Sequence, residues 1–199
     1  FSPSEPPPRE MNAADLKRVR EAFVQAARRA SRLGLDAVEL HAAHGYLLHT
    51  FLSPLANRRS DSYGGQLENR MRFPLEVFSA LREVWPVAKP LGVRISACDW
   101  IEGGWDLPQS IEFARRLKAA GCDWIDASSG GLAPEQKITP GPGFQVPFAE
   151  AIRKEVGIPT IAVGLITEPQ QAEDIIAASR ADMVALARGM LFEPNWAWR

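Results

Sequence analysis

The sequence has few of the residues from which metal centres and disulfide frameworks are built. Its 199 residues include two cysteines, Cys98 and Cys122, and three histidines. The cysteines lack the C-x-x-C spacing of zinc and iron–sulfur sites, and two cysteines are too few for a disulfide framework. We therefore expect no metal site in this chain.

An excess of one charge and long apolar runs are lacking as well. Lysine and arginine total 23, aspartate and glutamate total 24, and the formal net charge is −1, so no basic field favours nucleic acid or an anionic membrane. No apolar run approaches the ~18 residues of a membrane span, and the Pro-rich residues 1–9 lack the apolar core of a signal peptide. The composition predicts a globular cytoplasmic protein without nucleic-acid or membrane partners.

What the sequence does contain is a regular alternation of helical and strand patterns. Apolar residues return at helical spacing between Asn12, which can cap a helix, and Gly34, which can end it. Further helical segments then alternate with short apolar runs. We expect helices over about 12–34, 68–85, 110–120, a short one ending at 156, and 168–179, and strands over about 36–42, 91–97, 123–128, 158–163 and 181–187.

This order of elements predicts right-handed β-α-β crossovers and a parallel α/β sheet, which fits either a doubly wound sheet or a (β/α)8 TIM barrel. The barrel is favoured because Glu39, His41 and Arg94 lie opposite apolar residues, as in a barrel interior, and because no G-x-G-x-x-G follows the first strand. A complete barrel takes about 250 residues and eight strands. We therefore expect residues 1–199 to form a single partial TIM-barrel domain, and the start at Phe1 suggests a processed or truncated piece.

Two imidazoles and a phenol follow the first predicted strand, where a barrel has its active-site rim. His41, His44 and Tyr46 supply these proton donors. Because they are three residues apart, the two histidines would face opposite sides of an ideal strand. Both reach one pocket only if the strand ends near Ala43. His49 is expected to be helical or at the surface, without a role.

Longer motifs resemble a known family. Residues 41–47 are His-Ala-Ala-His-Gly-Tyr-Leu, residues 57–65 are Asn-Arg-Arg-Ser-Asp-Ser-Tyr-Gly-Gly, and residues 68–70 are Glu-Asn-Arg. This pattern resembles the Old Yellow Enzyme family of FMN-dependent ene-reductases, and the His/His pairing resembles its bacterial branch, typified by xenobiotic reductases and YqjM-type enzymes. The whole chain resembles the C-terminal part of that barrel, from the helix before strand 4 to the end of strand 8.

The resemblance implies an enzyme in which NADPH or NADH reduces FMN, after which an alkene conjugated to a carbonyl or nitro group is reduced. His41 and His44 would bind the substrate by donating hydrogen bonds to its activating oxygen. Tyr46 would protonate the substrate carbon. The partners are therefore expected to be small-molecule activated alkenes, and we expect the full-length protein to be a homo-oligomer.

The resemblance also implies where FMN binds. Arg94 lies on the inward strand face, where a charge needs a partner such as Glu39 or Asp126. In the family, the arginine of this strand lies against the flavin pyrimidine and stabilises negative charge on reduced FMN. The FMN phosphate would be held after the last two strands, by Gly164, Ala187 and Arg188. The family often has glycine where Ala187 stands, a change that backbone donation tolerates.

Two other functions stay open. The chain could be a non-catalytic half-barrel that serves as an assembly or folding unit, or a metal-dependent barrel hydrolase with His41 and His44 as ligands, although no further His or Cys completes a usual zinc set. We expect the chain alone to bind FMN weakly or not at all, because the family's contacts from strands 1 to 3 are absent. The substrate and the choice between NADH and NADPH are not readable from the sequence.

Overall fold

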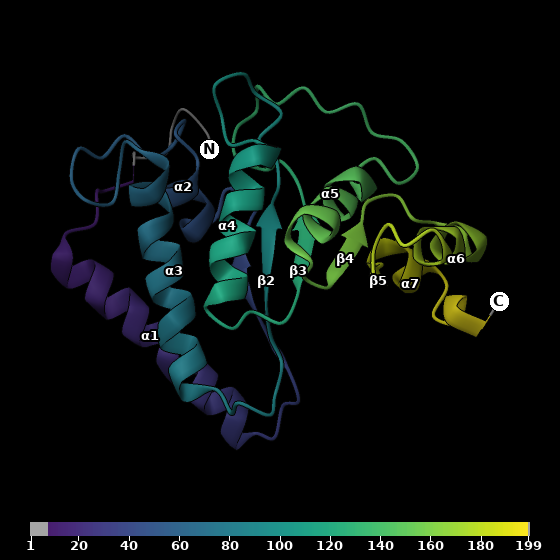
Figure 1. The fold of residues 1–199 in the computed structure, drawn as a ribbon, viewed down its shortest axis with the longest axis horizontal. Coiled ribbons are helices and arrows are strands. Elements are labelled where there is room, and N and C mark those ends of the chain that lie inside the picture. Colours follow the sequence, from purple (N-terminus) through teal and green to yellow (C-terminus); the bar gives the residue numbers. More distant parts are fainter. Residues whose placement is uncertain (1–7, 199) are drawn as a thin grey trace.

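The computed structural model describes residues 8–198, which form one five-stranded parallel sheet with helices packed against it (Figure 1). The strands are β1 (Val38–Ala42), β2 (Leu91–Ser96), β3 (Ile125–Ser128), β4 (Thr160–Val163) and β5 (Met183–Ala185), and they pair in chain order. The helices are α1 (Ala13–Arg32), α2 (Leu47–Leu52), α3 (Leu67–Val84), α4 (Leu107–Ala119), α5 (Val146–Val156), α6 (Pro169–Ala177), α7 (Arg188–Phe192) and a 3-10 turn at Trp196–Trp198. The predicted parallel α/β architecture is confirmed.

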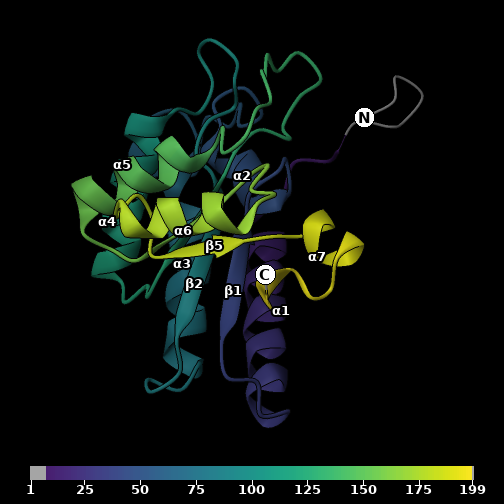
Figure 2. The ribbon, with the colours of Figure 1, turned by 90° about the vertical axis from the view of Figure 1, so that its right-hand side faces the viewer.

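The sheet coils strongly along its strand order. In Figure 2, β5 runs across the direction of β1 and β2, as expected when the right-handed twist between neighbouring strands accumulates. Helices α3, α4 and α5 form an outer layer in front of the sheet in Figure 1, and α1 packs beside α3. This arrangement is a curved wall with helices on its outer side, as in a segment of a barrel.

The two faces of the sheet differ as the strand alternation predicts. The outer face is apolar and is buried under the helices; its members and their helical partners include Leu40, Val93, Ile95, Ile125, Phe73, Val77, Phe78, Phe113 and Leu117. The inner face carries polar side chains, because His41, Arg94 and Asp126 occupy one register row across three strands. The carboxyl ends of all five strands meet at the same edge, which we call the rim.

The helix ends follow the local sequence signals. Asn12 caps α1, since its side chain accepts from the Asp15 N–H at 3.0 Å while the Asp15 carboxylate accepts from the Asn12 N–H at 3.1 Å. Gly34, with φ +80°, follows the end of the helix. The short helices α2 and α7 were not predicted, because six and five residues are too few for a helical period to show. Within residues 8–198, no helix is long and apolar enough to cross a membrane.

A tryptophan packs against the inner face of the sheet near the amino-terminal ends of the strands. The indole of Trp124 lies across Gly92, where an added Cβ would be 2.0 Å from the ring, and its Nε1–H donates to Glu39 Oε2 at 2.8 Å. Glycine is therefore required at the second position of β2 by close packing, since Gly92 has no unusual backbone angle.

We predict that Gly92→Ala lowers the free energy of unfolding by roughly 1–3 kcal/mol, the usual cost of overpacking, because the methyl group displaces the indole. Gly141→Ala is the matched control, since nothing lies within 4 Å of an added Cβ there. Urea unfolding of both variants measures the difference. Equal stability of the two variants would contradict the packing argument.

Candidate active site

The rim after β1 brings two imidazoles and a phenol together. The strand ends at Ala42, and the chain then turns through His44 at φ +58° and Gly45 at φ +73°. The His41 and His44 rings lie 5.3 Å apart, and the His41 and Tyr46 rings are also separated by 5.3 Å between centroids. The early strand end that the sequence required for a shared pocket is therefore present. Gly45 is needed here, because an added Cβ would lie 2.4 Å from the Gly131 carbonyl oxygen.

His44 is held by serines from the next two strands. Its backbone N–H donates to Ser96 Oγ at 2.9 Å, and its Nε2 lies 2.7 Å from Ser128 Oγ. Ser96 in turn donates to the Gly130 carbonyl at 2.8 Å. These serines, at the ends of β2 and β3, tie the His44 turn to the sheet.

Both imidazoles are neutral at physiological pH. Burial, followed by the positive charge of Arg94, lowers the pKa of His44 to about 4 and lowers the pKa of His41 from its ordinary value. A neutral imidazole carries one N–H donor and one acceptor nitrogen. Each ring can therefore donate one hydrogen bond without holding a full charge.

Arg94 forms an ion pair with Asp126, one of the two partners that the sequence suggested. Arg94 Nη1 lies 3.2 Å from Asp126 Oδ2, and Asp126 is 3% exposed. Burial raises the pKa of Asp126 to about 7, with Arg94 opposing the shift and Glu39 adding to it. Arg94 Nε and Asp126 Oδ1 are buried without a hydrogen-bond partner among the described residues. The pair is therefore incompletely satisfied on the inner face.

The predicted phosphate residues form a second group, after β4 and β5. Gly164 has φ +111° and is half-buried, whereas Ala187, which precedes α7, and Arg188, its first residue, are exposed. Within residues 8–198, no hydrogen bond or ion pair joins Arg188 to the imidazoles. The structure therefore gathers His41, His44, Tyr46 and Arg94 at one part of the rim and the phosphate residues at another.

A buried glutamine connects the two groups. Gln145 Oε1 accepts from Ser129 Oγ and lies 3.5 Å from Ser128 Oγ, while its Nε2 donates to the Val163 carbonyl at 3.2 Å. An added Cβ at Gly164 would lie 2.5 Å from Gln145 Nε2. The glycine after β4 thus makes room for the side chain that crosses the rim.

His49 takes one of the two placements expected from the sequence, in a helix and not at the surface. It is completely buried, and its Nε2 lies 2.8 Å from the equally buried Asp99 Oδ1. The available signal was Asp99 itself, a carboxylate three residues past the end of β2, on the side of the sheet where a barrel places its functional groups.

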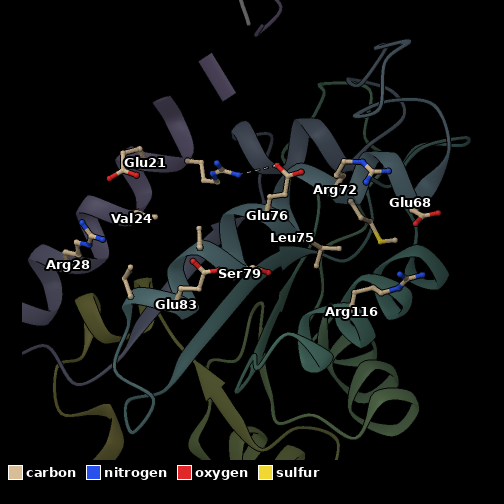
Figure 3. Close-up of a pocket in the computed structure, with 14 residues that line it drawn as sticks. Glu21, Val24, Arg28, Glu68, Arg72, Leu75, Glu76, Ser79, Glu83 and Arg116 are labelled. Atoms are coloured by element: carbon tan, nitrogen blue, oxygen red, sulfur yellow. Dashed lines mark ion pairs between the residues drawn. The ribbon is translucent and has the colours of Figure 1, made fainter. Parts of the chain in front are cut away.

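A groove lies elsewhere, on the outer helical layer. It has a volume of about 720 Å³, and arginines and glutamates of α1, α3 and α4 line it (Figure 3). Arg20 and Glu76 face one another across it at 3.9 Å. None of the rim residues lines this groove. Among residues 8–198, no group of three or more His, Cys, Asp or Glu could hold a metal ion.

Comparisons with known proteins identify the family of the chain. The profile of the NADH:flavin oxidoreductase / NADH oxidase family matches residues 2–199. The chain belongs to this family. An NADPH dehydrogenase of Geobacillus thermodenitrificans (strain NG80-2) is 50% identical over 196 residues, which are 98% of this chain and 57% of that protein.

Solved structures support the family assignment. A 2-naphthoyl-CoA reductase in complex with 2-naphthoyl-CoA is similar to this chain with a TM-score of 0.87 and 31% identity. The match covers 94% of this chain and 29% of the reductase chain. An old yellow enzyme homologue from Zymomonas mobilis is similar with a TM-score of 0.79 and 25% identity. The match covers 96% of this chain and 53% of the homologue. The resemblance to Old Yellow Enzymes is confirmed. The chain spans just over half the length of the curated relatives it matches, which accords with an incomplete barrel.

We predict that the effect of Asp126→Asn on stability depends on pH. The native carboxyl stays protonated up to a pKa of about 7, whereas the usual value is 3.8. The native state therefore binds more protons between these values, and wild-type stability is lost as pH rises from about 4 to 7, by roughly 1.4 kcal/mol per unit of pKa difference at most.

Asp126→Asn removes this dependence, so the free energy of unfolding of the variant rises relative to that of the wild type between pH 5 and pH 8. Urea unfolding at both pH values measures the gain, and Asp174→Asn, an exposed change of the same kind on α6, serves as control. A stability difference that does not vary with pH would argue against the buried carboxyl.

Proposed function

We propose that the natural polypeptide carrying this chain is an FMN-dependent NAD(P)H oxidoreductase that reduces activated C=C bonds of α,β-unsaturated carbonyl or nitro compounds. The observation that carries the proposal is the cluster of His41, His44 and Tyr46 at the rim, with Arg94 on the same inner face. A chain of the NADH:flavin oxidoreductase family with this cluster has the donors that such a reaction needs. Self-association and a cytoplasmic setting stay predictions.

The residues of the inner face fit FMN. Arg94 Nε is buried and has no partner among the described residues, so it can donate to a polar ring placed on this face. Arg94 would hold the flavin ring, and the residues after β4 and β5 would hold the phosphate, namely Gly164, Ala187 and Arg188. When bound, FMN supplies the hydride, which originates from NADPH or NADH.

The imidazoles would bind the activating oxygen of the substrate. His41 and His44 are neutral, and hydrogen bonds from both withdraw electron density from the alkene without requiring a buried positive charge. If Ser128 donates its hydroxyl proton to His44 Nε2, the ring proton is on Nδ1 and is available to the substrate. Ser128 would then select the tautomer that binds.

Tyr46 would move the proton. Its side chain is 66% exposed and its ring lies beside His41, so the phenol is within reach of both solvent and a substrate held by the imidazoles. It would donate its proton to the substrate carbon and recover one from water. Tyr46 therefore needs no buried proton path.

The test is a double substitution in the natural polypeptide. We predict that His41→Ala/His44→Ala lowers kcat/KM for reduction of cyclohexenone by NADPH by on the order of 10²-fold or more, the usual loss when a donor to a developing oxyanion is removed. FMN content, measured from flavin absorbance, is the control and is expected to be unchanged, because Arg94 and the phosphate residues are retained. Unchanged turnover in a fully loaded double variant would overturn the assignment.

A further inference from the structure

His49 and Asp99 form a buried pair directly beneath the rim that the proposed reaction does not use. Both side chains are 0% exposed. His49 lies in α2 and Asp99 follows β2, so the contact joins two segments that are 50 residues apart. Burying a carboxylate and an imidazole is costly unless their hydrogen bonds are all made. A buried His–Asp pair at this position is therefore expected to have a role that an apolar contact could not perform.

Every polar atom of the pair has a partner. The Gly45 N–H donates to His49 Nδ1 at 2.9 Å, and His49 Nε2 lies 2.8 Å from Asp99 Oδ1. Asp99 Oδ2 accepts from Ser53 Oγ at 2.6 Å and from the Trp105 N–H at 2.7 Å. Burial alone would raise the pKa of Asp99, but these hydrogen bonds outweigh it and hold the pKa below its usual range.

These contacts fix the proton of His49. Nδ1 accepts from the Gly45 N–H, so it carries no proton in the neutral ring, and the single ring proton is on Nε2, where Asp99 accepts it. Moving the proton to Nδ1 would place two N–H groups against each other. Asp99 thus keeps His49 in the form that accepts from Gly45.

The Gly45 N–H, which donates to His49, belongs to a turn with an unfavourable backbone conformation. His44 and Gly45 are consecutive residues with positive φ, and the left-handed region is unfavourable for a residue with a side chain such as His44. The turn directs His44 toward His41 and leads into Tyr46. Its backbone is held by the Ser96 contact at His44 and by the His49 contact at Gly45.

We propose that His49 and Asp99 are positioning residues that fix the turn at His44 and Gly45 and so set where the His44 imidazole stands relative to His41 and Tyr46. The proposal rests on the proposed function for its consequence in substrate binding. Its structural part, the control of the His44 environment by a buried tautomer, does not depend on FMN or on a substrate.

Two amide substitutions test the two hydrogen bonds of His49 separately, one at Nδ1 and one at Nε2. In His49→Asn, the amide oxygen takes the place of Nδ1 and can accept from the Gly45 N–H, but the side chain is too short to reach Asp99. In His49→Gln, the amide nitrogen takes the place of Nε2 and can donate to Asp99, but no acceptor faces Gly45. Both variants lose one buried hydrogen bond, so both are expected to lose stability by similar amounts.

Ser53→Ala is the matched control. It removes a buried hydrogen bond to the same Asp99 carboxylate without touching Gly45. Asp99→Asn is the complementary variant. The Ser53 hydroxyl and the Trp105 N–H both donate to the Oδ2 side, so they hold the amide oxygen of this variant there and turn its N–H toward His49. The ring proton must then move to Nδ1, which breaks the Gly45 contact, so this variant is expected to resemble His49→Gln.

The first readout is the titration of His44, followed by NMR of the 199-residue chain without cofactor. We expect His49→Gln and Asp99→Asn to move the titration midpoint of His44 from about 4 toward 6.5, because the released turn exposes the ring. His49→Asn and Ser53→Ala are expected to leave it in place. Equal shifts in all four variants, or no shift in any, would overturn the proposal.

A second readout needs no variant. The ¹⁵N chemical shifts of His49 in the wild-type chain report which ring nitrogen carries the proton, and we expect the Nε2–H form. Detection of the Nδ1–H form would overturn the proposal even if a variant failed to fold.

The third readout is kinetic and uses the natural polypeptide. We expect His49→Gln to raise KM for cyclohexenone by up to about tenfold, the equivalent of one lost hydrogen bond, while His49→Asn and Ser53→Ala stay within about twofold of the wild type. If the wild type does not reduce enones, the proposed function fails, whereas the two NMR readouts still decide the role of His49.

Discussion

The parallel register of the sheet is the constraint on which the site depends. It places the carboxyl ends of five strands at one rim and puts His41, Arg94 and Asp126 in a single row across three of them. Because side chains alternate along a strand, the same register turns Leu40, Val93 and Ile125 toward the helices. A shift of one residue in any strand would exchange the two faces and bury the charges in the apolar layer. The strand register therefore determines both the packing of the apolar face and the placement of the polar row.

Partial burial gives the polar row its chemical character. It favours the neutral form of the His41 and His44 imidazoles, so each ring can donate one hydrogen bond without carrying a charge, and it raises the pKa of Asp126 to about 7. The charge of Arg94 adds to the lowering of both histidine pKa values and opposes the raising of the Asp126 pKa. Burial is the larger cause in each case, and the guanidinium has a buried Nε without a hydrogen-bond partner among the described residues.

Long elements and named motifs could be predicted from the sequence, whereas contacts between distant segments could not. The capped helix from Asn12 and the strands with alternating residues were found because their signals are local. The gathering of His41, His44 and Tyr46 depended on a strand end near Ala43, which the sequence could state only as a condition. The burial of His49 was not predicted, because its partner Asp99 is 50 residues away and α2 is too short to show which of its faces is buried.

The hydrogen bonds of Gln145 link the two separate parts of the rim that are proposed to bind one ligand. The amide joins the serines beside His44 to the carbonyl of Val163, the residue before Gly164. An amide held at both ends in a buried place cannot rotate without breaking a hydrogen bond at one of them, and each unpaired group would cost about 1–3 kcal/mol. Gln145 therefore adds a buried hydrogen-bonded connection between these two parts of the rim to the pairing of β3 with β4. The proposed ligand, FMN, has its reactive ring at one end and its phosphate at the other, and binding it at both parts of the rim would require this separation to stay constant. This requirement would be a reason for a polar side chain to be buried here.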